Sequence, residues 1–167
     1  MIVLGGTHAG AVYARSEIEV DALIDHIMND LIQRGVTHDG FEIVPERAVL
    51  SIVEGRYPEE TDQRWPSNYL YVSVNTERGY GALKWWTNKV PADAPEGHAS
   101  RHVWTSGNLH PPSFDPQLIE DPGSPTYYPR EAAILVPQVR AAVEEFCRER
   151  TGARPECIPW LLLNQSV

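Results

Sequence analysis

Three histidines in the middle of the chain are the first candidates for metal binding and catalysis. His98 and His102 are four residues apart, a spacing that aligns two metal ligands on one face of a helix, and His110 follows later. Glu96-Gly97 and the β-leaning run His102-Val103-Trp104 argue against a helix here. A three-histidine site therefore requires the loop to fold back, and a small metal-dependent hydrolase stays open as an alternative function.

Carboxylates in expected loops and at strand ends are the second candidate group. Paired carboxylates of this kind perform acid–base chemistry in glycoside hydrolases. An acid-rich surface is also the ordinary state of a chain with 23 acidic and 14 basic residues. The acids that could serve are Glu54, Glu59, Glu60, Asp62, Glu120 and Asp121.

The glycine-rich start of the chain does not match a nucleotide-binding motif. After Gly5-Gly6-Thr7-His8-Ala9-Gly10, a phosphate-binding loop needs Lys and then Ser or Thr, but Ala11-Val12 stands there. No Gly-x-Ser-x-Gly motif is present, and Cys147 falls in an apolar helical stripe without a nearby histidine. The sequence therefore carries no enzyme signature, and we expect no catalytic residue, no bound metal and no cofactor.

Aromatic side chains are more informative than these polar groups. Trp85 and Trp86 are adjacent on an expected strand, so their side chains must point to opposite faces of a sheet. One can enter the core, whereas the other either faces outward or is covered by a long loop. Trp and Tyr ringed by charge are typical of protein interfaces.

Two amphipathic helices can position these residues. Ser16 and Glu19 form a capping box before an apolar stripe of helical period, and Gly35 is expected to end that helix. The second helix begins near Pro137, which suits a first helical turn, and ends before Gly152 and Pro155. A final strand containing Trp160 follows, and Trp160 is expected in the core.

Strand patterns fill the segment between the helices. Residues 48–53 are rich in β-branched residues, and residues 68–76 alternate cleanly before a turn and a second strand over 80–86. Residues 100–105 predict another strand. The order indicates an α+β fold, with a mainly antiparallel sheet of about five strands and two amphipathic helices packed on one face.

Length and composition predict one domain over residues 1–167, with residues 1–15 as an N-terminal extension and 107–130 as a long proline-rich loop. No run of about 18 apolar residues or signal-peptide core is present, so a cytoplasmic location is expected. The two cysteines, Cys147 and Cys157, are expected to be buried apolar residues. The net charge of −9 argues against direct nucleic-acid binding.

The order of several motifs resembles an immunity-protein family of bacterial polymorphic toxin systems, the kind encoded beside nucleic-acid deaminase toxins. The residues that carry the resemblance run from about Ser16 to Trp160. They are Val20-Asp21-Ala22-Leu23-Ile24, Leu70-Tyr71-Val72-Ser73-Val74, Gly79-Tyr80-Gly81-Ala82-Leu83, Val136-Pro137, Val139 to Phe146, Thr151-Gly152-Ala153-Arg154-Pro155 and Trp160.

This resemblance implies a small non-catalytic α+β protein that binds and silences a cognate toxin, such as a zinc-dependent cytosine deaminase acting on double-stranded DNA. The chain would occlude the active site or the nucleic-acid groove of its toxin. An immunity protein to a nuclease toxin stays open as an alternative. The expected partner-binding residues are Glu59, Glu60, Asp62, Trp65, Trp86, Trp104, Phe114, Glu120, Asp121, Tyr127 and Tyr128.

Overall fold

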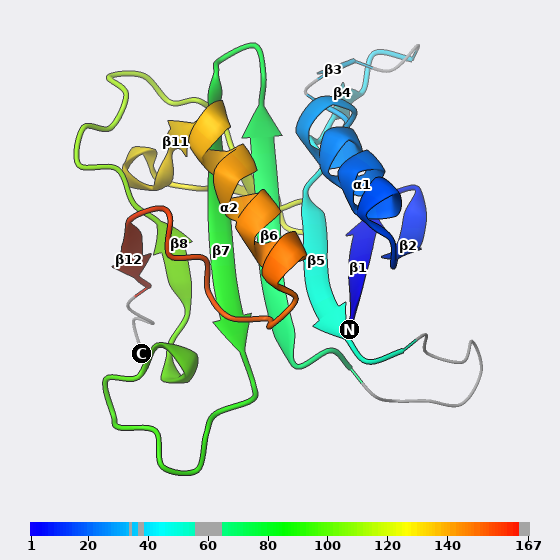
Figure 1. The fold of residues 1–167 in the computed structure, drawn as a ribbon. Coiled ribbons are helices and arrows are strands. Elements are labelled where there is room, and N and C mark those ends of the chain that lie inside the picture. Colours follow the sequence, from blue (N-terminus) through cyan, green and yellow to red (C-terminus); the bar gives the residue numbers. More distant parts are fainter. Residues whose placement is uncertain (34, 37–38, 56–64, 164–167) are drawn as a thin grey trace.

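One antiparallel sheet of eight strands dominates the fold. The computed structural model describes residues 1–33, 35–36, 39–55 and 65–163. The strand order is β12-β8-β7-β6-β5-β1-β2, and β11 pairs separately with β7 (Figure 1). The strands of this sheet are β1 (Ile2–Thr7), β2 (Gly10–Ala14), β5 (Ala48–Val53), β6 (Asn68–Asn75), β7 (Tyr80–Thr87), β8 (Trp104–Ser106), β11 (Ile134–Leu135) and β12 (Trp160–Leu162).

Eight further elements, four helices and four short strands, complete the described part of the chain. Two small two-stranded sheets lie outside the main sheet. The remaining elements are α1 (Glu17–Asn29), β3 (Gly35–Val36), β4 (Glu42–Ile43), the 3₁₀ helix η1 (Ala99–Arg101), β9 (Ile119–Asp121), β10 (Thr126–Tyr127), the 3₁₀ helix η2 (Arg130–Ala132) and α2 (Val136–Glu149).

The hairpin of β6 and β7 forms the centre of the sheet. Its register pairs Tyr69 with Trp86 and Tyr71 with Lys84. Leu70, Val72 and Val74 are buried in the main core, as the alternation of the sequence predicts. The antiparallel α+β class is therefore confirmed.

The first helix begins at the residues that the sequence indicates. The Ser16 side chain accepts a hydrogen bond from the Glu19 backbone N–H, and the Glu19 carboxylate accepts from the Ser16 N–H. These hydrogen bonds from Ser16 and Arg15 lower the pKa of Glu19. The helix ends at Asn29 rather than near Gly35, and Leu31, just beyond its C-cap Asp30, is still buried in the main core.

The second helix ends on a residue other than the expected glycine. Arg150 itself adopts the left-handed conformation at the C-cap, with φ of 53°, and Gly152 adopts it two residues later, with φ of 75°. At Gly152 an added Cβ would also lie 2.6 Å from the side chain of Asn68. Glycine is therefore required there for both conformation and space.

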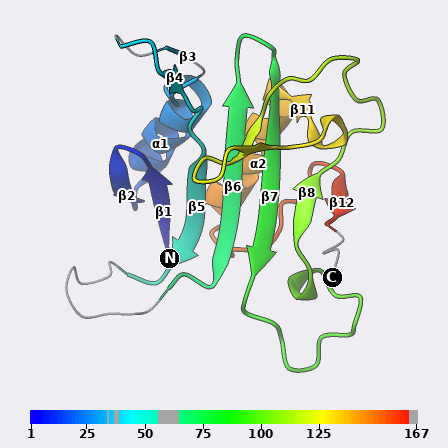
Figure 2. The same cartoon turned by 180° about the vertical axis from the view of Figure 1, so that it is seen from behind.

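The main core lies between the helices and the sheet. Figure 1 draws α1 and α2 in front of the sheet, and Figure 2 draws them behind it. Leu23 and Ile27 of α1 and Val143 and Phe146 of α2 belong to one buried cluster with Trp85 of β7. A second, smaller cluster joins Ala82 to Leu118, Tyr128, Ala132 and Ala133.

The sheet has three more strands than expected, and two segments supply them. Residues 1–15, expected as an extension, contain β1 and β2, which form a hairpin on β5. Residues 134–135 add β11. The strand expected over 100–105 is instead the turn η1 followed by the short β8, since the His98 side chain caps the Ser100 N–H.

The two cysteines differ in environment. Cys147 is fully buried, as expected, and burial raises its pKa to about 12. Cys157 is exposed instead of buried, since it lies in the loop before β12 and not on the strand, and its N–H donates to the Glu145 carboxylate. Partial burial and Glu145 raise the pKa of Cys157 to about 12. Both thiols are therefore protonated at neutral pH.

No helix in the described residues is both long and apolar enough to cross a membrane.

Candidate functional site

The face of the sheet opposite the helices carries a row of aromatic side chains. Trp85 is 3% exposed and its Nε1 donates to the Gly152 carbonyl oxygen at 3.1 Å, so it belongs to the core. Its neighbour Trp86 must therefore point to the other face, which we call the open face. Trp86 is half-buried there.

Two tyrosines of β6 extend this row across the sheet. The ring of Tyr69 stacks on Trp86 with centroids 4.4 Å apart and planes 18° from parallel. Tyr71 lies 6.2 Å from Tyr69, at an interplanar angle of 11°. The Arg47 guanidinium then stands 4.4 Å above the Tyr71 ring. The three rings and the cation therefore form one continuous row of stacked side chains across the open face.

A segment of the long proline-rich loop crosses part of the open face. We call residues 116–128, which contain β9 and β10, the strap; Figure 2 shows it passing over β6 and β7. Lys84 of β7 pairs with Glu120 at 2.8 Å, and Arg47 donates to the Glu120 carbonyl oxygen. Asn75 donates to the Pro116 carbonyl oxygen at 3.0 Å. The strap is thus bound to β6, to β7 and to Arg47, the residue before β5.

The strap covers Ala82 but leaves a groove beside Trp86. One hollow of about 490 Å³ is lined by Arg47, Tyr71, Lys84 and Asp121. A second hollow of about 260 Å³ is lined by Val90, Arg101 and His102. Trp86 and Val103 line both hollows. We call the two hollows together the Trp86 groove.

The structure places the expected contact residues in separate regions instead of one surface. Trp65 is 81% exposed and precedes β6 at one end of the sheet. Phe114 contacts Tyr80 and Arg78 at the opposite end of the β6–β7 hairpin. Trp86, Glu120 and Asp121 lie between these ends, on the open face. Glu59, Glu60 and Asp62 lie outside the described residues.

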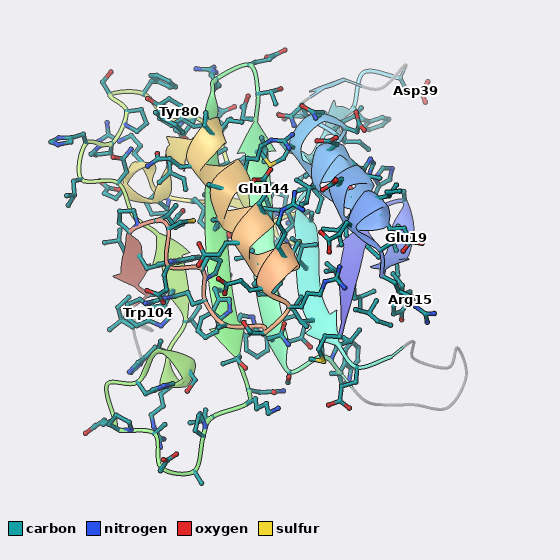
Figure 3. All side chains as sticks on the ribbon, in the orientation of Figure 1. Arg15, Glu19, Asp39, Tyr80, Trp104 and Glu144 are labelled. Carbon is teal, nitrogen blue, oxygen red and sulfur yellow. The ribbon has the colours of Figure 1, made fainter. Side chains whose placement is uncertain are left out.

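Trp104 has a structural contact on the helix side of the sheet. The Arg154 guanidinium stands 4.3 Å above the Trp104 ring and 5.8 Å from Trp160. Trp104 also donates to the Ala99 carbonyl oxygen at 2.9 Å. Figure 3 labels Trp104 on the lower left of the ribbon, near β8. This stack ties the segment after α2 to the edge of the sheet, with Trp160 partly buried against the main core.

The two adjacent tyrosines of the loop lie in different surroundings. Tyr127 is 40% exposed on β10. Tyr128 is 4% exposed in the second cluster, and no described residue hydrogen-bonds its hydroxyl. Burial and the nearby Glu120 carboxylate raise the pKa of Tyr128. In this structure Tyr127 offers a surface, and Tyr128 serves packing.

The histidines that could have formed a metal site are engaged separately. His98 Nδ1 lies 2.7 Å from Ser100 Oγ, and His102 Nε2 lies 3.1 Å from the Glu96 carbonyl oxygen. Within the described part of the chain, no group of three or more His, Cys, Asp or Glu side chains could hold a metal ion.

Sequence reasoning missed Arg47, Tyr69, Tyr71 and Lys84 as site residues. A signal was present, because Tyr69 and Tyr71 alternate with the buried Leu70 and Val72 and must share the face of Trp86. The Arg47 contact joins residues 24 positions apart and depends on strand pairing, which no local pattern predicts.

Most of the chain matches one known protein family. The family model described as "Immunity protein Imm1" matches residues 8–162, which include the open face, the strap and both helices. A search of the curated proteins finds no match.

Proposed function

This chain belongs to the Imm1 family of immunity proteins, and we propose that it neutralises a toxin of the nucleic-acid deaminase type. Membership of the family is the observation that carries the immunity function and implies a cognate toxin as partner. The deaminase class of that toxin is the further step. It is supported by the motif resemblance described above and by the charge of the chain.

Charge supports a partner that handles nucleic acid. Such a toxin must hold phosphate groups, so its substrate groove carries basic side chains. A chain with net charge −9 is steered toward a basic surface, and its association rate rises as a result. Occlusion of the active site or of the nucleic-acid groove would then block the reaction.

The affinity must come mainly from buried anchors and not from this charge. A catalytic toxin is harmless only if almost no toxin molecule is free. Protection therefore requires nanomolar binding, which is a binding free energy of about −12 kcal/mol. Large aromatic side chains supply most of such energy in protein interfaces. The exposed or half-buried candidates are Trp65, Trp86, Phe114 and Tyr127.

A nuclease toxin is the second candidate partner, since a nuclease also holds phosphate in a basic groove. The net charge of −9 supports this partner equally. Both versions place the protein in the cytoplasm of the cell that makes the toxin, without a cofactor and without catalysis.

Co-expression with the neighbouring toxin domain tests the proposal. The toxin domain encoded beside this chain should arrest growth alone and fail to do so when this chain is present. Purified together, the two proteins should form a stoichiometric complex in which cytosine deamination of a DNA substrate is lost. Nuclease activity in the free toxin would assign the second candidate, and full toxin activity in the presence of this chain would refute the immunity role.

Replacement of Tyr127 by Ala tests the long loop as a contact. Because Tyr127 is exposed, the variant should weaken toxin binding by over 1 kcal/mol with the melting temperature nearly unchanged. Unaltered affinity would remove this tyrosine from the interface. Tyr128 is not a matched partner in this test, since its burial makes an Ala replacement destabilising.

A further inference from the structure

The Trp86 groove reverses the charge balance of the protein. Three cations line it, Arg47, Lys84 and Arg101, whereas Asp121 is the one acid among its described lining residues. The whole chain has 23 acidic and 14 basic residues. A general attraction to basic surfaces therefore does not describe what this groove would bind.

Two of the three cations keep their charge without a carboxylate partner in the described structure. Lys84 is paired with Glu120 at 2.8 Å. Arg101 donates from Nε and Nη2 to the Ala94 carbonyl oxygen, at 3.2 and 2.9 Å, and Arg47 donates to that of Glu120. Carbonyl oxygens satisfy hydrogen bonds but leave the unit charge in place, so anionic groups are favoured near both guanidinium groups.

The arrangement of the two hollows predicts where charged and apolar side chains of a bound partner would lie. Arg47 lines one hollow and Arg101 lines the other, with Trp86 as the wall between them. One face of the Trp86 ring is covered by Tyr69 at 4.4 Å. The remaining indole surface borders the hollows and suits an apolar or aromatic side chain.

We propose that the Trp86 groove binds an extended acidic segment of the toxin, with an apolar side chain against Trp86 and carboxylates toward Arg47 and Arg101. This inference rests on the proposed function and adds a contact of opposite polarity to it. Acidic surfaces of this chain steer the toxin from a distance, whereas the cationic groove recognises one acidic segment. Two contacts of opposite sign fix the orientation of the complex, because a reversed orientation sets like charges together.

Isothermal titration calorimetry measures the affinity of purified variants of this chain for the neighbouring toxin domain. The toxin domain carries an inactivating substitution so that it can be produced alone. Arg101→Glu is the main variant because this side chain is exposed and its replacement leaves the core untouched. Trp86→Ala removes the wall of the groove. The matched control is Arg15→Glu, the same charge reversal at an exposed site on the helix side, labelled in Figure 3.

Arg101→Glu should weaken binding by roughly tenfold or more, and Trp86→Ala by roughly thirtyfold. The control should stay within about twofold of the unaltered protein. A single Asp or Glu to Lys change on the toxin surface should restore the affinity of Arg101→Glu, which a folding defect would not allow. Circular dichroism melting curves check that each variant is folded.

The outcomes separate this inference from the function on which it rests. If the unaltered protein binds the toxin and both groove variants bind equally well, the proposed role of the Trp86 groove is wrong and the immunity role stands. If the unaltered protein does not bind, the proposed function itself fails. A fluorescein-labelled single-stranded thymidine oligonucleotide should not bind at physiological salt; Arg101-dependent binding of this probe would assign the groove to nucleic acid and overturn the inference.

Discussion

The two faces of the central sheet differ in what covers them. The helix side is closed by α1 and α2 over a continuous core, whereas the open face carries stacked rings, paired charges and a strap that covers part of it. Trp85 and Trp86 show the difference between neighbouring residues of one strand. The first is 3% exposed and bonded to Gly152, and the second lines the two hollows.

This difference separates stability from recognition. A side chain on the helix side is fixed by contacts on all sides, so its replacement affects the fold. A side chain on the open face leaves part of its surface to a partner, so its replacement affects binding more than folding. If this separation holds, a replacement on the helix side lowers stability more than a comparable replacement on the open face.

Trp85→Ala should lower the free energy of unfolding by about 3–5 kcal/mol, because it empties a large buried site. Trp86→Ala should lower it by roughly half of that or less, since the ring is only half-buried. Urea denaturation of both variants measures the two values. Equal losses would show that both faces are equally important for the fold.

Gly81→Ala should destabilise the protein by about 1–3 kcal/mol through overpacking under α2. An added Cβ would lie 2.7 Å from the Ser73 carbonyl oxygen and 2.8 Å from Val139 Cγ2. The control is Gly97→Ala, where no such atom lies within 4 Å, and a change within about 0.5 kcal/mol is expected. Equal urea midpoints for the two variants would contradict the close approach of helix and strand.

Glu46→Gln should reduce the loss in the free energy of unfolding that accompanies a fall in pH. Burial raises the pKa of Glu46, but N–H groups of His8 and Ile32 and the His8 ring lower it, leaving it below its ordinary 4.5. A pKa lower in the folded state means that the carboxylate stabilises the fold above the unfolded pKa, and this contribution is lost as pH falls through the folded pKa.

Urea denaturation at a series of pH values between neutral and acid measures this loss. The variant should be less stable at neutral pH and change less on acidification than the unaltered protein. Glu77→Gln, at an exposed acid in the β6–β7 turn, is the control. An unchanged slope in the Glu46 variant would show that its carboxylate is not responsible.

Tyr128→Phe should raise the free energy of unfolding by about 1 kcal/mol, the smallest of these effects. The hydroxyl of Tyr128, the last residue of the strap, is buried without a hydrogen-bond partner in the described structure, so its removal ends a desolvation cost. Toxin affinity should not change, because Tyr128 lies below the surface. A less stable variant would mean that the hydroxyl is satisfied after all.

Local signals predicted a large part of the fold. The capping box at Ser16, the alternation of residues 68–74 and the turn before Tyr80 each depend on near neighbours in the chain. The N-terminal hairpin and the strands at residues 134–135 and 160–162 were missed or given other bounds, because each becomes a strand through pairing with a distant one.

The candidate site was less predictable than the fold. The structure places Trp86, Glu120 and Asp121 together on the open face, but it places Trp65 and Phe114, expected in the same contact surface, at opposite ends of the sheet. Tyr128 was expected beside Tyr127 at the surface and is buried. Which member of a loop turns inward depends on the cluster it meets, here Ala82 and Ala132.

Periods of 3.6 and 2 residues specify the α+β class, the core stripe and the opposite orientations of Trp85 and Trp86, and the capping box and Pro137 specify the helix starts. Other contacts depend on tertiary structure: Arg47 stacks on Tyr71 and donates to the Glu120 carbonyl oxygen, and Glu120 pairs with Lys84. These contacts join residues 24 to 73 positions apart. They exist only after strand pairing has fixed which distant segments lie together.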